Sequence, residues 1–259
     1  GDRMTRYRTF ALCITLLFGT LAAFAVKDVL YQVSTINALL QGIYDGPTTV
    51  KSLLAHGDFG IGTFNHLDGE MVVLDGVCYQ IRSDGTVSAM PDKTFTPFAA
   101  ITTFAPEQVL HIAAPTTLKA LEAVIAKALP SPNRFYAIRI TGDFATVRAR
   151  SVPRQQKPYP LLTEVVKTQP VFEMKDVAGI LVAFYCPPYV AGINVTGYHL
   201  HFLREDRKAG GHVLDCTVKS ATVQVDSLAT FQLALPDDPV FNTADLTTGT
   251  PADVQQVEK

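Results

Sequence analysis

Three of the six histidines in this sequence lie close together, in the segment GYHLHFLREDRKAGGH that spans residues 197–212. His199 and His201 are two residues apart, so in a β-strand their side chains point to the same face. The polar segment REDRKAGG that follows predicts a hairpin loop, and His212 then begins a strand that returns alongside the first. The spacing therefore predicts three imidazoles that converge on one point.

Three converging imidazoles are typical of a metal site. Three histidines with the remaining positions open are a common arrangement for catalytic zinc, because water or substrate can take the open positions. Neutral imidazole also binds copper, iron and nickel, so the pattern predicts a metal more firmly than its identity. No cysteine lies in a C-x-x-C pair, which excludes a cysteine-rich zinc site. The competing interpretation is a set of surface or cross-strand histidines without a metal.

The composition fits a folded protein and gives no reason to expect a nucleic-acid partner. The chain has 259 residues, enough for one large domain or two modest ones. Hydrophobic residues make up 47% and charged residues 18% of the chain, so a full core can form. The formal net charge is −2 without a long block of one sign, which argues against binding to nucleic acid or to an acidic lipid surface.

The first 25 residues have the layout of a secretory signal peptide. Arg6 and Arg8 precede an apolar run from about Phe10 to Ala25, and Ala23 with Ala25 forms an A-x-A-like cleavage site. An uncleaved membrane anchor and a buried N-terminal helix are the alternatives, because the run is at the short edge of what spans a bilayer. We expect cleavage, export to the periplasm or the medium, and no stable membrane association afterwards; without cleavage the protein would be membrane-anchored.

The rest of the chain is predicted to combine many strands with few helices, in an α+β fold. Three Asp-Gly pairs in the first half predict a β-meander with tight turns. Apolar residues at helical spacing predict a helix over 118–129 that Pro130 closes. Prolines between 153 and 160 indicate a linker. We therefore divide the mature chain into a mixed-sheet N-terminal domain, 26–152, and a smaller β-rich domain, 153–259, that carries the metal and an active-site tail.

Two alternatives to a three-histidine catalytic zinc remain open. In cupins, an H-x-H pair is followed by a glutamate, for which Glu205 is the candidate, but a second motif with another histidine should follow. This chain has no histidine after His212. The other alternative is an exported zinc-binding protein without catalytic activity, in which a fourth protein ligand would close the metal site.

Segments far from the histidines make the sequence resemble the alpha-acetolactate decarboxylase family. They are GTFNHLDGEMVVLDGVCYQIRSDG (residues 62–85) and FYAIRITGDFATVRARSV (residues 135–152), and GYHLHFLREDRKAGGHVLDC (residues 197–216) completes the pattern in the same order. The resemblance runs from about Tyr31 to the C-terminus. It implies a two-domain α/β fold in which a mixed N-terminal sheet can pair across a homodimer and a smaller sheet carries the metal.

The resemblance also implies an activity and a set of site residues. The implied enzyme uses zinc to convert (S)-2-acetolactate into (R)-acetoin and carbon dioxide. The implied zinc ligands are His199, His201 and His212, the implied polar groups around the metal are Glu70, Arg150 and Glu258, and Thr63 would lie near the substrate.

The reaction accounts for these residue types. Loss of carbon dioxide leaves negative charge that is delocalised into the neighbouring ketone, and a divalent metal chelated by the ketone and hydroxyl oxygens stabilises this enediolate. A proton must then reach one face of the carbon to set the chirality of acetoin. We expect Arg150 to bind the carboxylate and deliver the proton, with Glu70 and Glu258 orienting the substrate or completing the metal shell.

Several of these polar residues also have an interpretation without catalysis. Glu70 follows an Asp-Gly pair and by itself would be a solvated hairpin residue. Glu258 is the penultimate residue, so it can act only if the C-terminal tail folds back over the metal. Asp215, three residues after His212, is a candidate hydrogen-bond partner for a ligand histidine. We expect the remaining histidines, at positions 56, 66 and 111, to be structural or exposed.

Overall fold

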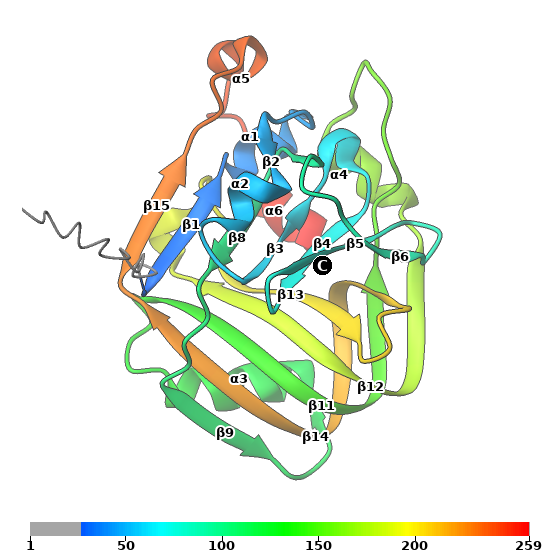
Figure 1. Cartoon of the computed structure of the whole chain (residues 1–259), viewed down its shortest axis with the longest axis vertical. Helices are drawn as coiled ribbons and strands as arrows, with labels where there is room; N and C mark the ends of the chain where they lie inside the picture. Colours follow the sequence, from blue (N-terminus) through cyan, green and yellow to red (C-terminus); the bar gives the residue numbers. More distant parts are fainter. Residues whose placement is uncertain (1–26, 259) are drawn as a thin grey trace, which may run out of the picture.

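The computed structural model describes residues 27–258, so the expected signal peptide, residues 1–25, lies outside the described residues. The described chain is an α+β structure with two large β-sheets and a few short helices (Figure 1). The first sheet has seven strands in the order β15-β1-β8-β3-β4-β5-β6. In that order, their bounds are Thr230–Ala234, Val29–Val33, Ala99–Thr102, Phe59–Thr63, Glu70–Leu74, Val77–Ile81 and Val87–Ala89.

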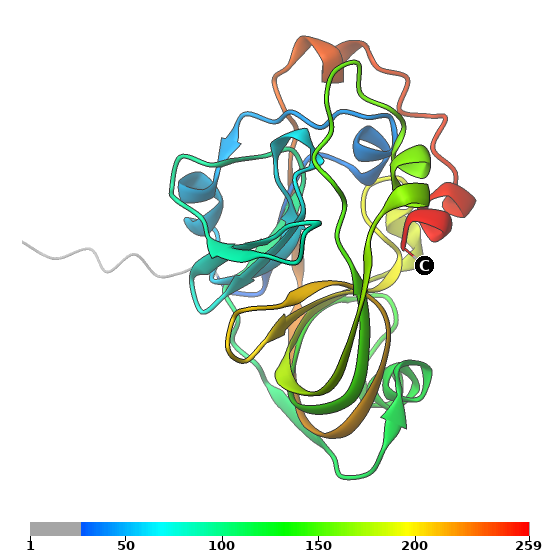
Figure 2. The same cartoon turned by 90° about the vertical axis from the view of Figure 1, so that its right-hand side faces the viewer.

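The second sheet has six strands, and four of them close on themselves into a small barrel. β11 pairs with β12 and β14, β13 pairs with β12, and β13 also pairs with β14 around His201 and His212. Figure 2 shows these curled strands nearly end on. The strands of this sheet are β9 Gln108–Ile112, β10 Thr116–Thr117, β11 Phe135–Arg150, β12 Val171–Cys186, β13 Gly197–Arg204 and β14 Gly210–Leu228; a separate pair is β2 Thr48–Thr49 with β7 Phe95–Thr96.

The helices are short and lie at two places. α3 packs against the barrel, whereas α1, α4 and α6 gather at the opposite end of the molecule (Figures 1 and 2). Within the described residues, no helix has both the length and the apolar character that crossing a membrane requires. The helices are α1 Ile36–Leu40, α2 Val50–Leu54, α3 Leu118–Ala128, α4 Leu162–Val165, α5 Pro239–Thr243 and α6 Pro251–Glu258, with 3-10 turns η1 Asn65–Leu67, η2 Val166–Thr168 and η3 Pro188–Val190.

The longest helix forms where the apolar spacing predicts it. Thr117 is the N-cap of α3, and its hydroxyl accepts a hydrogen bond from the backbone N–H of Ala120. Leu121 and Ile125 are buried against the barrel. The helix ends at Ala128, two residues before Pro130, which cannot continue it.

The Asp-Gly pairs form the predicted meander, with one difference. Asp75 and Gly76 join β4 to β5 with positive φ at both residues, as the tightest hairpin turns require. The third pair lies in the turn between β5 and β6. The first pair, Asp68 and Gly69, is not a two-residue turn, because it ends a longer connection that passes through η1 before β4 begins.

The two sheets do not divide the chain at the expected boundary between residues 152 and 153. β9, β10 and β11 precede that point yet belong to the second sheet, and β15 follows it yet pairs in parallel with β1. The proline-containing segment 153–160 is a connection between β11 and β12. Because these two strands are paired along nearly their full length, a dense hydrogen-bond ladder crosses the expected boundary.

Clusters of buried apolar residues pack the two sheets and the helices against one another. One cluster fills the barrel, and a second joins the two sheets through contacts such as Phe59 of β3 with Phe184 of β12. A third packs Val254 and Val257 of α6 against the residues of α1 and α4. This apolar packing therefore holds the C-terminal helix α6 against the end of the barrel at which β13 and β14 meet.

A buried aspartate on β14 makes the stability of the fold depend on pH. Asp226 is fully buried; one carboxylate oxygen accepts a hydrogen bond from the N–H of Ala105, and the other has no partner. Burial, reinforced by nearby acidic groups, raises the pKa of this carboxyl from 3.8 to about 6. The folded state therefore binds this proton more tightly than the unfolded state, so the associated stability is present at low pH and is lost as pH rises through about 6.

We expect Asp226→Asn to stabilise the protein at neutral pH, because the amide oxygen can still accept from Ala105 and no buried charge must form. The gain in unfolding free energy should be small near pH 4 and reach at most about 3 kcal/mol above pH 7. Chemical denaturation of both proteins from pH 4 to pH 8 measures it. A difference that does not change with pH would contradict this account.

Candidate metal centre and active site

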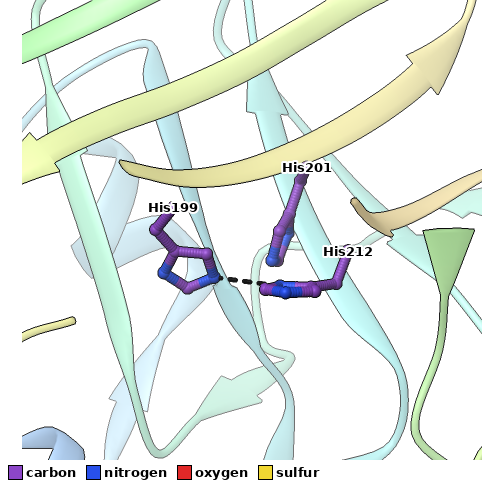
Figure 3. Close-up of side chains that lie close together, drawn as sticks. All are labelled: His199, His201 and His212. Carbon is purple, nitrogen blue, oxygen red and sulfur yellow. Dashed lines mark hydrogen bonds between the residues drawn. The ribbon is translucent and has the colours of Figure 1, made fainter. Parts of the chain in front are cut away.

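The three histidines meet at the junction of β13 and β14. His199 and His201 lie on β13, and His201 is directly opposite His212 of β14 in the strand register. One ring nitrogen from each residue lies within 4.8 Å of the others, and the three side chains point toward one another (Figure 3). All three residues are buried. The structure therefore brings together the histidines that the strand alternation and the hairpin predict.

In two of the three histidines, a hydrogen bond to a backbone carbonyl identifies the ring nitrogen that carries the proton. Nδ1 of His201 donates to the carbonyl of Met71 at 2.8 Å, so Nε2 presents its lone pair to the centre. Nε2 of His212 donates to the carbonyl of Glu258 at 3.1 Å, so Nδ1 is its free nitrogen. This Nδ1 lies 3.2 Å from Nε2 of His199 (Figure 3). Two tetrahedral zinc ligands would be separated by about the same distance, ~3.3 Å.

Burial keeps the histidines in the form that binds metals. Loss of hydration, followed by the positive charge of Arg150, lowers the pKa of His199 to about 3. The pKa values of His201 and His212 lie well below the usual value for the same main reason. All three imidazoles are therefore neutral at pH 7, and no proton must leave before a metal binds.

Two glutamates lie beside the histidines. Glu70 begins β4, and its Oε2 lies 3.6 Å from Nε2 of His201. Glu258 ends α6, and its Oε2 lies 3.5 Å from Nε2 of His199. Burial raises the pKa of each carboxyl to about 7, although the charge of Arg150 opposes the shift in both. Glu70 is therefore not a solvated hairpin residue, and the C-terminal tail does fold back over the histidines.

Arg150 connects the two glutamate-bearing elements. It ends β11 and is 5% exposed. Its Nη1 donates to Oε1 of Glu70 at 2.7 Å, and its Nη2 donates to the carbonyl of Val257 at 2.6 Å. Its Nε is buried without a hydrogen-bond partner. The N–H at Nε is therefore left unpaired for a ligand.

The unpaired atoms at this site test whether its residues fit a metal. Nε2 of His201 and Oε2 of Glu258 are buried without hydrogen-bond partners, and both are lone-pair groups. Groups of this kind lose hydration on burial and are costly unless something satisfies them. A divalent cation among the histidines would satisfy both, and the nitrogen-rich donor set suits zinc. The residues present therefore fit a zinc ion.

A cavity lies beside the three histidines, and Thr63 is part of its wall. Thr63 also holds the start of β4. It is paired with Glu70 in the strand register, and its hydroxyl donates to the carbonyl of Gly69 at 2.7 Å. Gly69 has a φ of +86°, and a side-chain carbon there would lie 2.3 Å from the carbonyl oxygen of Ile81. Only glycine fits this turn, so the LDGE segment fixes where the Glu70 side chain begins.

Comparison with known proteins identifies the family. The model of the alpha-acetolactate decarboxylase family matches residues 30–248. The alpha-acetolactate decarboxylase of Methanosarcina mazei is 48% identical over 233 residues, which is 90% of this chain and 81% of that protein. The enzyme of Klebsiella aerogenes is 43% identical over 237 residues, 90% of this chain and 91% of that protein. The chain belongs to the alpha-acetolactate decarboxylase family. It is accordingly an enzyme of the carboxy-lyase class.

Crystal structures of the same family share this fold. The alpha-acetolactate decarboxylase of Bacillus subtilis strain 168 superposes with a TM-score of 0.88 at 43% identity, over 89% of this chain and 99% of that chain. A Staphylococcus aureus protein described as similar to alpha-acetolactate decarboxylase gives a TM-score of 0.84 at 31% identity, over 88% and 98% of the two chains. The α+β fold with mixed sheets is therefore that of alpha-acetolactate decarboxylases.

In this member of the alpha-acetolactate decarboxylase family, an apolar wall faces the histidines across the cavity. Sequence reasoning did not identify this wall, which comes from α1, η1, α4 and two loops. The residues are Ile36, Leu39, Leu67, Phe98, Val152 and Leu162. The segment STINALL contains a threonine cap and apolar spacing that could have indicated α1, but no local signal places α1 opposite β13 and β14.

Other candidates lie away from the histidines. Asp215 is exposed, and its carboxylate accepts from the N–H of Cys216. It therefore does not hold His201, whose Nδ1 donates to the carbonyl of Met71 instead. Glu205, the glutamate that a cupin would place on the metal, is exposed in the loop between β13 and β14. The cupin interpretation therefore has no support from the site.

The three remaining histidines are structural or exposed, as expected. The ring of His56 stacks on that of Tyr31 with a centroid distance of 3.6 Å. Nδ1 of His66 lies 2.5 Å from the hydroxyl of Tyr159. His111 is exposed on β9. The described cysteines also take no part in the site, because they are buried and none forms a disulfide (Cys78, Cys186 and Cys216).

Proposed function

We propose that this protein uses zinc to decarboxylate (S)-2-acetolactate to (R)-acetoin and carbon dioxide. The observation that carries the proposal is the pair of unpaired buried lone-pair groups, on His201 and Glu258, beside three neutral imidazoles. Family membership supports the substrate, because the relatives described above are named for acetolactate. Zinc held by the histidines would supply a Lewis acid for the ketone and hydroxyl oxygens of the substrate, stabilising the enediolate.

Arg150 is proposed to bind the carboxylate that departs. Its unpaired Nε can donate to a carboxylate oxygen, and its other two nitrogens are held in place by Glu70 and by the carbonyl of Val257. In the reaction the bond between the carboxylate carbon and the carbinol carbon breaks. Its electron pair stays on the carbinol carbon, and that carbon then takes up one proton.

A proton relay through Arg150 is consistent with its contacts. Arg150 would deliver a proton to one face of the carbon while Glu70, at 2.7 Å, replaces it. Burial raises the pKa of Glu70 to about 7, which suits proton exchange near neutral pH. Glu258 is proposed to orient the substrate or to complete the metal shell, and Thr63 to contact the substrate from the cavity wall.

A structural zinc site is the second candidate, because it would need only a fourth protein ligand. The carboxylate oxygens of Glu70 and Glu258 lie at similar distances from the nearest ring nitrogens, 3.6 Å and 3.5 Å. The buried guanidinium and the apolar wall favour catalysis, since a structural site has no use for either. The decisive experiment is incubation with (S)-2-acetolactate, followed by chiral analysis of the product. Equal amounts of both acetoin enantiomers would reject the proposed one-sided protonation.

The proposal extends to assembly and location. We propose a homodimer that pairs edges of the seven-stranded sheet, whose outermost strands are β15 and β6. We also propose that the leader is cleaved after Ala25 and that the protein is exported. Light scattering of the purified protein tests the dimer, and N-terminal sequencing of protein recovered outside the cytoplasm tests the cleavage.

A further inference from the structure

Asn37 joins the beginning and the end of the chain. It is the second residue of α1 and is 8% exposed. Its Nδ2 donates to the carbonyl of Leu246 at 2.8 Å and lies 3.5 Å from the carbonyl oxygen of Gly249. Both acceptors belong to the segment that leads into α6. One side chain therefore holds the approach to the helix that ends at Glu258.

The fit between Asn37 and the C-terminal segment is close. A side-chain carbon added at Gly249 would lie 2.5 Å from Oδ1 of Asn37 and 2.7 Å from its Cγ. Gly249 is not among the residues with positive φ, so its backbone conformation does not itself require glycine. A side chain at Gly249 would therefore require the Asn37 amide to move from its observed position.

The hydrogen bonding of Asn37 indicates a role beyond filling the core. Its Oδ1 is buried without a hydrogen-bond partner. A buried polar atom without a partner destabilises the folded state, and an apolar residue of similar size would avoid that loss. The favourable contribution of this side chain is its donor nitrogen, which acts on the C-terminal segment.

Apolar contacts hold the C-terminal segment on both sides of Asn37. On the N-terminal side of Gly249, Phe241 of α5 and Leu246 pack with Ala38 and Ile43. On its C-terminal side, α6 packs against α1 and α4 through Val254 and Val257. Figure 2 shows α6, in red, beside these two helices. Such contacts tolerate sliding, whereas a hydrogen bond fixes the position along the chain.

We propose that Asn37 is a positioning residue that fixes the register of the C-terminal segment and so holds Glu258 over the three histidines. The inference rests on the proposed function of Glu258. When α6 is in place, the carbonyl of Val257 accepts from Arg150 and that of Glu258 accepts from His212. Without the amide of Asn37, the apolar contacts keep α6 nearby but leave these two backbone contacts less populated.

Two double-mutant cycles test the proposal. The first combines Asn37→Ala with Glu258→Gln, and the second combines Asn37→Ala with Gly249→Ala. The control is Asn242→Ala, an exposed asparagine of α5 in the same C-terminal segment. For each protein we would measure kcat and KM on 2-acetolactate, zinc content, and amide hydrogen exchange in residues 250–258.

We expect Asn37→Ala to lower kcat about tenfold with unchanged zinc content, because a hydrogen bond of ordinary strength is lost. Exchange in residues 250–258 should become faster, and Asn242→Ala should change neither quantity. In the Glu258→Gln background, Asn37→Ala should have almost no further effect on kcat. Gly249→Ala should resemble Asn37→Ala, and the Asn37→Ala, Gly249→Ala double variant should be no worse than either, since the clash is then removed.

Two results would overturn the proposal. One is a kcat for Asn37→Ala equal to that of the unaltered protein, with unchanged exchange in α6. The other is a loss of kcat that multiplies with that of Glu258→Gln, because a general structural defect acts independently of Glu258. An inactive unaltered protein would instead count against the proposed function, and the exchange measurements would still decide whether Asn37 holds the segment.

Discussion

Replacement of His201 by alanine is expected to abolish zinc binding and to lower kcat/KM on 2-acetolactate by on the order of 10³-fold or more. His201 is the most deeply buried of the three histidines, and its Nε2 has no hydrogen-bond partner. Its other nitrogen is held by the carbonyl of Met71, so the ring is already oriented for a metal. Zinc analysis of the purified variant and steady-state kinetics measure the two effects.

The matched control for this change is His111→Ala. His111 is exposed on β9, opposite Thr222 of β14, and does not line the cavity. It should tolerate alanine with unchanged zinc content and rate. If His201→Ala retained zinc and activity at the level of this control, the three histidines would not form the metal site.

The second large effect is expected from Arg150→Lys, which should lower kcat by about 10²- to 10³-fold while zinc remains bound. Lysine keeps the positive charge but cannot donate from three positions in one plane. The hydrogen bonds to Glu70 and to the carbonyl of Val257 cannot both survive, and the unpaired Nε is lost. Steady-state kinetics with parallel zinc analysis measures the change.

Arg148→Lys provides the control, because Arg148 precedes Arg150 by two residues on β11 and is exposed. We expect it to be indistinguishable from the unaltered protein. Retention of a nearly normal kcat in Arg150→Lys would show that a positive charge is sufficient. Planar recognition of the carboxylate would then be unnecessary.

Local sequence patterns predict much of the candidate metal centre because its three histidines are close together in the chain. The alternation in GYHLHFL places His199 and His201 on one face, and the polar loop returns His212 to the same place. The turn at Asp75 and Gly76 is predicted for the same reason, since both residues tolerate positive φ. These features are determined by a few neighbouring residues. The tertiary contacts of the fold are compatible with them and do not change them.

The surroundings of the histidines depend on contacts between distant segments. Eighty positions separate Glu70 from Arg150, whose side chains form a 2.7 Å ion pair. No local periodicity specifies that pairing, and the resemblance to a family was needed to associate the two residues. The partner of His201 is the backbone carbonyl of Met71, which any residue at that position would supply. For this reason Asp215, a plausible side chain in the sequence, was the wrong candidate.

Strand pairing crosses the expected domain boundary for a related physical reason. Prolines 153, 158 and 160 correctly indicate an irregular segment. An irregular segment ends a domain only if few contacts cross it, and strand pairing between β11 and β12 is invisible in local composition. The closure of the barrel through β13 and β14 and the parallel pairing of β15 with β1 are long-range in the same way.

The most direct test of the account measures zinc content together with acetoin and carbon dioxide release from 2-acetolactate. The purified protein is assayed as isolated, after removal of metal by a chelator, and after zinc is returned. The account predicts one zinc ion per chain, loss of activity on chelation, and recovery on readdition. Full activity in metal-free protein, or no activity in the fully metallated protein, would contradict it.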